Sequence, residues 1–342
     1  EVKRRNGGAR EKPVETVSHF KYLGVTFSHD GSWRAHQKNM VKAAEAGLFV
    51  INRIRYKAQE VSVDLLEKIF NTMIEPIVLY GCEVWGTDCV SKIVNKLNVK
   101  FCKHILGVAN ATTNSAVLLE TGRQHTSVRV ALRVLKYWLK LREETGNRPL
   151  QRKCLDIGIH NNDWVKKVKT MLQEWGVGEV FDTENVPINI NFKRIRSTVE
   201  NKSFLELKNE CAKKMLVPDF IRTKESEGRE DYINKLNRDK RRIVATFRLG
   251  GWKWNVEKDD EGNRICILCN GQESEKHLMF EYERMQEERE GRISTINEGE
   301  HANWMQQILN DGNKENLGKL AEFLRLAMKK RKEALEVARG NN

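Results

Sequence analysis

Apolar residues recur at helical spacing along most of this chain, and that pattern predicts a mainly α fold. The clearest stripe recurs every four residues and consists of Ile93, Leu97, Phe101 and Ile105. The segment Ser127 to Arg142 repeats the design, with one face formed by Val128, Leu132, Leu135 and Leu139. Two helices that each have one apolar face are typical of a helical bundle.

Further helices are predicted on both sides of this pair. Ser32 is a candidate N-cap for a helix that runs to about Tyr56. A helix is predicted from Val63 to Tyr80, and Pro76 must kink or restart it. Later helices are expected in the segments around Trp164 to Trp175, Phe204 to Met215, Tyr232 to Leu249 and Trp304 to Arg339.

A short β segment precedes the helices. Val17 to Phe27 is rich in aromatic and β-branched residues, and it ends at the turn cluster His29-Asp30-Gly31. Gly24 lies inside this segment, which indicates a point where the backbone closely approaches another group. We expect strands here, with the helices packing behind them.

These patterns divide the chain into four parts. We expect a β segment over residues 1–34 and a helical bundle over 35–150. A helical connector should span residues 151–237, with a break around Pro187. Residues 238–342 should form a basic helix, a small Cys-Cys-His domain and a helical tail.

Charge is distributed unevenly along the chain. The net charge is +13, and residues 1–150 hold 24 Lys and Arg against 14 Asp and Glu. Between Lys92 and Arg142 there are ten basic residues and one acidic residue, Glu120. Such a one-sided field attracts polyanions, and nucleic acid is the expected partner. A membrane is not expected, because the apolar faces of these helices suit a protein core and no apolar run is long enough to span a bilayer.

The basic residues form two rows. One row consists of Lys92, Lys96, Lys100 and Lys103, and the other of Arg129, Arg133, Lys136 and Lys140. A solvated helix face is the alternative interpretation, but such faces usually alternate Lys with Glu. No acidic residue occurs from Ser91 to Asn110. We therefore predict that both rows contact phosphates, together with Arg241 and Arg242 near the Cys-Cys-His cluster.

Cys266, Cys269 and His277 have the spacing of a zinc knuckle. These residues supply three ligands of a tetrahedral Zn²⁺ ion, so two alternatives remain open. The segment either binds zinc weakly, with a carboxylate or water as the fourth ligand, or it is a metal-free remnant held together by packing. The other cysteines among the seven of the chain are scattered through helical patterns, which favours reduced thiols in an intracellular protein.

Catalytic motifs are missing from the sequence. No aspartate pair lies on a predicted strand, and the only adjacent aspartates, Asp259-Asp260, occur in a charged turn. We find no nucleophile elbow, phosphate-binding glycine loop or His-Glu-x-x-His motif. No catalytic residue is therefore assigned to this chain.

Several short motifs follow one another in order along the chain. They are Phe20 to Gly24 (FKYLG), Glu75 to Gly86 (EPIVLYGCEVWG), Phe101 to Val108 (FCKHILGV), Leu119 to Arg123 (LETGR), Asp163 to Val165 (DWV), Tyr232-Ile233 and Arg248 to Gly250 (RLG). The ordered set, ending at the Cys-Cys-His cluster, resembles the C-terminal part of the reverse transcriptases of non-LTR (LINE-type) retrotransposons. The resemblance extends over nearly the whole chain.

This resemblance implies a role for each part. Residues 1–34 would be the end of the palm, with Tyr22, Leu23 and Gly24 in a primer-grip-like hairpin. Residues 35–150 would be the thumb. The catalytic aspartates of such enzymes, and the Mg²⁺ ions that they bind, would belong to an upstream polymerase domain of the same polyprotein.

The chain departs from the family pattern at two places. The family usually has a proline after the Gly-Arg pair, and Gln124-His125 stands there instead. The family has a fourth cysteine ligand five residues after the histidine, and that position is Tyr282. The second change indicates a decaying copy of an element or a domesticated variant.

The function predicted from these observations is to hold the template–primer duplex of an RNA-directed DNA polymerase. The expected ligands are an RNA–DNA hybrid, RNA or DNA. The expected location is the nucleus and cytoplasm. This chain alone is not expected to have polymerase activity. Two alternatives remain: a stand-alone, domesticated nucleic-acid-binding protein, and a helical protein–protein scaffold whose basic faces meet acidic partners.

Overall fold

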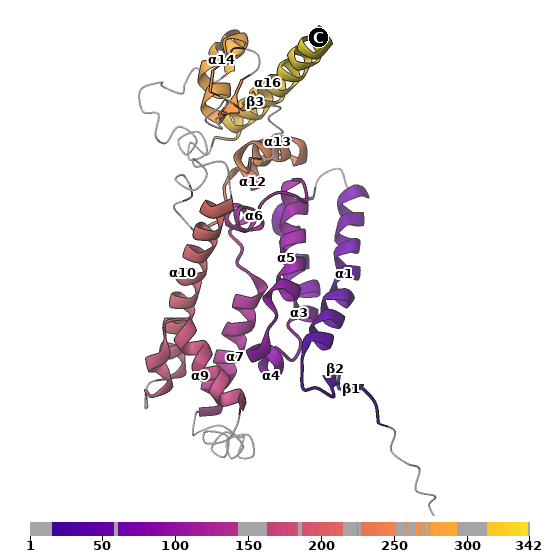
Figure 1. Cartoon of the computed structure of the whole chain (residues 1–342), viewed down its shortest axis with the longest axis vertical. Coiled ribbons are helices and arrows are strands. Elements are labelled where there is room, and N and C mark those ends of the chain that lie inside the picture. Colours follow the sequence, from indigo (N-terminus) through magenta and orange to yellow (C-terminus); the bar gives the residue numbers. More distant parts are fainter. Residues whose placement is uncertain are drawn as a thin grey trace, which may run out of the picture.

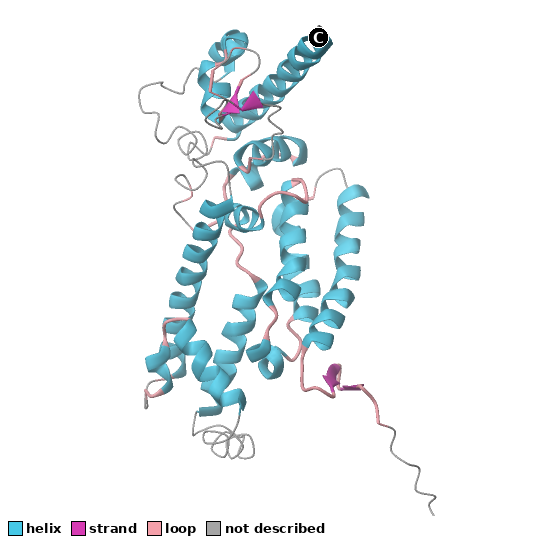
Figure 2. Cartoon of the chain, viewed as in Figure 1, coloured by secondary structure: helices cyan, strands magenta, loops and turns pink. Residues whose placement is uncertain are grey.

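The computed structural model describes residues 16–57, 61–142, 163–183, 187–214, 224, 227–250, 257–258, 264–266, 269, 271–272, 274–292 and 313–340. This part of the chain is mostly helical, which confirms the mainly α fold (Figure 2). The helices α1, α5, α7 and α10 run roughly alongside one another, and the C-terminal elements lie beyond one end of them (Figure 1). Within the described ranges, no helix is both long and apolar enough to cross a membrane.

The predicted β segment is an antiparallel hairpin of β1 (His19–Tyr22) and β2 (Val25–Ser28). Leu23 and Gly24 form its two-residue turn, with φ of 46° and 83°. The hairpin packs against the start of α1 (Arg34–Lys57), where the buried ring of His36 accepts a hydrogen bond from the Thr26 backbone N–H at 3.2 Å. Its outer residues Phe20, Tyr22 and Leu23 are exposed.

The helix predicted around Pro76 is interrupted as expected. It consists of α2 (Val63–Ile69), a π-helical turn η1 (Phe70–Ile74) and α3 (Glu75–Val78). Pro76 lacks the N–H that an α-helix would need there, so the chain restarts with the proline in the first turn of α3. Phe70 of the π turn stacks on Phe101 with their ring centroids 4.2 Å apart.

The centre of the bundle is formed by α5 (Ser91–Leu106), α6 (Asn114–Thr121) and α7 (Thr126–Arg142). Short turns α4 (Cys82–Trp85) and η2 (Gly86–Asp88) lead into them. Leu97, Phe101 and Ile105 of the predicted stripe are buried, as are Val128, Leu135 and Leu139 of α7. The stripes therefore form the core that their spacing predicts.

The connector region has the two expected helices, but the second is longer than predicted. After α9 (Asp163–Glu174) and η3 (Gly178–Phe181), α10 runs from Ile188 to Lys214. It begins directly after Pro187, so the predicted break is correct, but the helix starts well before Phe204. Its buried positions recur every four residues and consist of Asn191, Ile195, Val199, Ser203, Leu207 and Cys211.

The single helix predicted from Tyr232 to Leu249 is two helices, α12 (Tyr232–Lys235) and α13 (Arg238–Arg248). Asn237 caps α13, because its side-chain oxygen accepts a hydrogen bond from the Lys240 backbone N–H at 3.0 Å. Beyond them lie the strands β3 (Glu257–Lys258) and β4 (Arg264–Ile265), the turns η4 (His277–Glu281) and η5 (Glu283–Met285), and the helices α14 (Gln286–Arg292) and α16 (Lys314–Gly340).

A buried ion pair joins the bundle to α13. Glu120, at the end of α6, accepts hydrogen bonds from Arg248 at 2.6 and 3.1 Å and from the Tyr232 hydroxyl at 2.7 Å. All three side chains are buried. Glu120 is the one acidic residue between Lys92 and Arg142, and its charge is neutralised inside the protein.

Candidate nucleic-acid interface

A groove of about 590 Å³ lies between α7 and α10. Arg129, Arg133 and Lys136 line it from α7, and Arg196 lines it from α10. Arg123, from the loop between α6 and α7, lines one end. The acidic residues that line the groove are Glu200 and Glu227, so its lining has an excess of positive charge.

Several of these cations form ion pairs with carboxylates, so the excess positive charge of the groove comes from the others. Arg129 pairs with the buried carboxylate of Glu75 at 2.6 Å, and Arg196 pairs with Glu200 at 2.8 Å. Burial raises the pKa of the Glu75 carboxyl, while Arg129, Arg123 and Arg133 oppose that rise. Arg133 and Lys136 are exposed and pair with no carboxylate among the described residues. These two side chains are therefore the cations most available to an anionic ligand.

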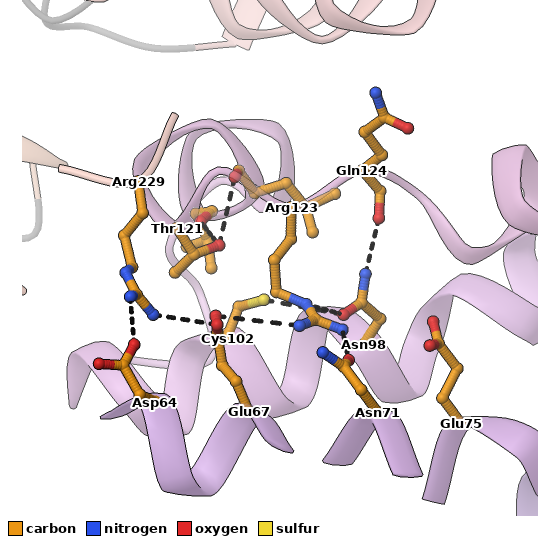
Figure 3. A network of polar contacts seen from close by, with 12 residues as sticks. Asp64, Glu67, Asn71, Glu75, Asn98, Cys102, Thr121, Arg123, Gln124 and Arg229 are labelled. Carbon is orange, nitrogen blue, oxygen red and sulfur yellow. Dashed lines mark hydrogen bonds and ion pairs between the residues drawn. The ribbon is translucent and has the colours of Figure 1, made fainter. Parts of the chain in front are cut away.

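A polar network fixes the Arg123 end of the groove (Figure 3). The Arg123 guanidinium donates to the side-chain oxygens of Asn98 at 2.8 Å and Asn71 at 2.9 Å. Asn98 in turn donates to the main-chain oxygen of Gln124 at 2.7 Å. The loop that enters α7 is thus tied to α5 and η1, although Gln124 stands where the non-LTR sequences usually have a proline.

The same network extends to the segment before α12. Arg229 pairs with Glu67 at 3.0 Å and also with Asp64 of α2 (Figure 3). Gly122 has a φ of +62°, and an added Cβ would lie 2.5 Å from the Arg229 backbone nitrogen. This close approach requires glycine at the end of α6. The groove therefore has a rigid end built from distant parts of the chain.

The second predicted row, on α5, lines a different groove. Lys92, Lys96, Lys100 and Lys103 line a space of about 1030 Å³ whose other wall contains Glu174, Glu206 and Glu210. Lys96 also pairs with Glu45 of α1 at 3.6 Å. Ser127, Val128 and Ala131 of α7 line this space, whereas Arg129, Leu132 and Arg133 line the other. The two rows therefore line different grooves, one on each side of α7.

Two residues of the predicted basic set are structural. Lys103 is buried and donates to the Asn110 main-chain oxygen at 2.6 Å, and burial lowers the pKa of its amine. Arg241 is buried and donates to the main-chain oxygens of Ile105 at 3.1 Å and Ile233 at 3.0 Å. Each side chain therefore satisfies carbonyl groups of the fold, and its assignment to a nucleic-acid surface stays a prediction.

Other predicted cations remain on the surface. Arg242 is exposed and its stem packs over Gly107. Lys140 is exposed one turn beyond Lys136 and does not line the groove.

The hairpin turn gives Gly24 the close contact that was expected of it. The Tyr80 hydroxyl donates to the Leu23 main-chain oxygen at 2.9 Å, and an added Cβ on Gly24 would lie 2.9 Å from Tyr80 Cε1. Leu23 is 73% exposed and Tyr22 is 59% exposed. The turn is therefore held from one side and open on the other.

Cys266, Cys269 and His277 come together as a cluster that could hold a metal ion. Their ligand atoms all lie within 4.8 Å of one another, and Cys269 Sγ is 3.2 Å from His277 Nε2. His277 Nδ1 lies 3.4 Å from a Glu281 oxygen, which is the outer contact that metal-bound histidines usually make. Tyr282 is buried nearby, with its ring centroid 6.0 Å from that of His277, and its hydroxyl has no hydrogen-bond partner in the described part of the chain.

The remaining described cysteines have no such surroundings. Cys82, Cys89, Cys102 and Cys211 form no disulfide among the described residues. Burial raises the pKa of the Cys102 thiol to about 11 and that of Cys211 to about 12. These thiols are core residues with low reactivity.

No known protein family, curated protein or solved structure matches this chain. Sequence reasoning missed Arg123, Arg196 and the aromatic residues Phe192 and Phe204 as lining of the α7–α10 groove. A signal was present, since Phe192, Arg196 and Phe204 recur at helical spacing along α10. Asp259-Asp260 lies outside the described residues.

Proposed function

We propose that this chain binds nucleic acid, with phosphates held by the cations of the α7–α10 groove. The observation that carries this proposal is the excess of cations on two facing helices, in which Arg133 and Lys136 are exposed and lack carboxylate partners in the described part. Phosphates carry regularly spaced negative charges, which suits a row of cations one helical turn apart. The α5 groove suits this role less well, because glutamates line its other wall.

We further propose that the chain is the C-terminal part of a non-LTR retrotransposon reverse transcriptase. The ordered motifs from Phe20 to Gly250 support this proposal. The hairpin contact between Leu23 and Tyr80 also supports it, because it joins the primer-grip-like motif to the motif that contains Tyr80. In that setting the bundle would be the thumb, the groove would contact one strand of the template–primer, and Mg²⁺ and catalysis would belong to an upstream domain.

The wild-type chain should bind nucleic acid with a steep dependence on salt. If the groove cations replace about four counterions, the logarithm of the binding constant should fall with the logarithm of salt concentration with a slope of about −3 to −4. Fluorescence anisotropy with a labelled RNA–DNA hybrid and with each single strand measures this slope. Undetectable binding at low salt for every ligand would contradict the proposal and favour the protein–protein scaffold.

We propose Zn²⁺ as the ion of the Cys266, Cys269 and His277 cluster. Two thiolates and an imidazole nitrogen are the donors that zinc prefers, and Glu281 is placed to orient the ring of His277. Bound zinc would stabilise this small C-terminal region by joining β4 to the turn η4. The fourth position is open to water or a carboxylate, which predicts an affinity below that of a complete site.

Elemental analysis after purification in zinc should find bound zinc in the wild-type chain and none in Cys269→Ser. Cys89→Ser is the matched control. It replaces a half-buried cysteine that is distant in sequence from the Cys-Cys-His cluster, so this variant should retain the metal. Tyr282→Cys restores the ligand of the resembled family at a buried position and should bind zinc more tightly. Equal zinc content in wild type and Cys269→Ser would contradict the assignment.

A further inference from the structure

The floor of the α7–α10 groove is apolar, although its rim is cationic. Leu118 and Leu119 of α6, Leu132 of α7 and the aromatic rings of Phe192 and Phe204 line it. A duplex would reach the cations through its phosphates but would leave this floor facing water, because its bases are paired and stacked inside. A ligand that fills the groove therefore has both an anionic part and a flat apolar part.

The cations and aromatic rings are close enough to serve one ligand. The Lys136 ammonium nitrogen lies 5.1 Å from the centroid of the Phe192 ring. Arg196 follows Phe192 by one turn of α10, and Arg133 precedes Lys136 by one turn of α7. A phosphate bound by Lys136 or Arg196 would thus bring its own base beside Phe192. Stacking of a base on an aromatic ring next to cations is how single strands are commonly held.

The rigid end of the groove adds a partner for a base edge. The main chain of Gln124 is fixed by Asn98, and its side chain lines the groove. A carboxamide offers both a donor and an acceptor, which suits the polar edge of an unpaired base. The side-chain nitrogen makes a long contact of 3.5 Å to the Glu200 main-chain oxygen, which a ligand would displace at little cost.

From this arrangement we infer that the α7–α10 groove takes unstacked bases of a single-stranded nucleic acid, with phosphates on its cationic rim and bases on Phe192 and Phe204. The inference rests on the proposed function and adds the form of the ligand. According to this inference, the groove contacts bases as well as phosphates, unlike a surface that binds a duplex through its phosphates alone.

Two strands with the same phosphates test this inference. The probes are an oligothymidine of about 12 nucleotides and an abasic strand of equal length, at one salt concentration. The wild-type chain should bind the thymidine strand about tenfold more tightly, because only that strand has bases that can stack on the two rings. The double variant Phe192→Leu, Phe204→Leu should bind both strands equally, at the level of the abasic strand.

The controls separate the inference from the proposed function. Phe49→Leu, at an exposed position of α1 outside the groove, should keep the wild-type preference for thymidine. Circular dichroism and thermal melting check that each variant is folded. Equal binding of both strands by the wild type would overturn the inference and leave nucleic-acid binding intact. If the chain binds neither single strand and no duplex, both the inference and the proposed function are overturned.

Discussion

Arg248→Met should lower the free energy of unfolding by about 3–5 kcal/mol, because it leaves a carboxylate buried without its cation. The Glu120 carboxylate would still accept a hydrogen bond from the Tyr232 hydroxyl, but its negative charge would stay buried away from water. The loss should weaken the attachment of α13 to the bundle, since the ion pair joins α6 to α13. Chemical denaturation followed by circular dichroism measures the change.

Arg242→Met is the matched control for this prediction. Arg242 lies on the same helix but is exposed, so its replacement should change stability by no more than about 0.5 kcal/mol. The double variant Glu120→Leu, Arg248→Met removes both charges and should be more stable than Arg248→Met alone. A loss below about 1 kcal/mol for Arg248→Met would show that the buried pair is not needed for the fold.

The double variant Arg133→Glu, Lys136→Glu should bind single-stranded nucleic acid about 100-fold more weakly than the wild type at moderate salt. Two cations that face phosphates become two anions, so the loss combines missing attraction with repulsion. The slope of affinity against salt should become shallower by about 1–2, one counterion for each lost contact. Fluorescence anisotropy over a range of salt concentrations gives both quantities.

Lys92→Glu, Lys100→Glu is the matched control on α5. It reverses the same number of charges on an exposed face, but that face lines the groove whose other wall contains glutamates. We expect a loss of about threefold at most, from the lower net charge of the chain. If the α5 variant loses as much affinity as the α7 variant, the whole basic surface binds without a preferred groove.

The helical core was predictable because it depends on local periodicity. The stripe from Ile93 to Ile105 is buried over most of its length, and Pro76 interrupts its helix as the missing N–H requires. The start of α10 was missed because polar Asn191 and Ser203 occupy two of its buried positions and hide the apolar stripe. The break between α12 and α13 was missed because the capping role of Asn237 was overlooked.

The fate of individual charges was not predictable from local sequence. Lys103 and Arg241 were predicted to contact phosphates on the surface, but both are buried, and Glu120 is buried as well. Their partners come from distant segments or from loops, as when Arg241 donates to the main-chain oxygen of Ile105. Similarly, the two basic rows are alike in sequence. Only the packing of α9 and α10 places Glu174, Glu206, Glu210 and Lys214 opposite the α5 row, and Arg196 and Glu200 opposite the α7 row.

Photo-crosslinking of the unmodified chain tests the central claim most directly. A single-stranded RNA that contains 4-thiouridine would be bound, irradiated and digested, and the linked peptides identified by mass spectrometry. The account predicts that the linked peptides come mainly from α7 and α10 and contain Leu132, Lys136, Phe192 or Phe204. Crosslinks confined to α5, the hairpin or the C-terminal region would contradict it.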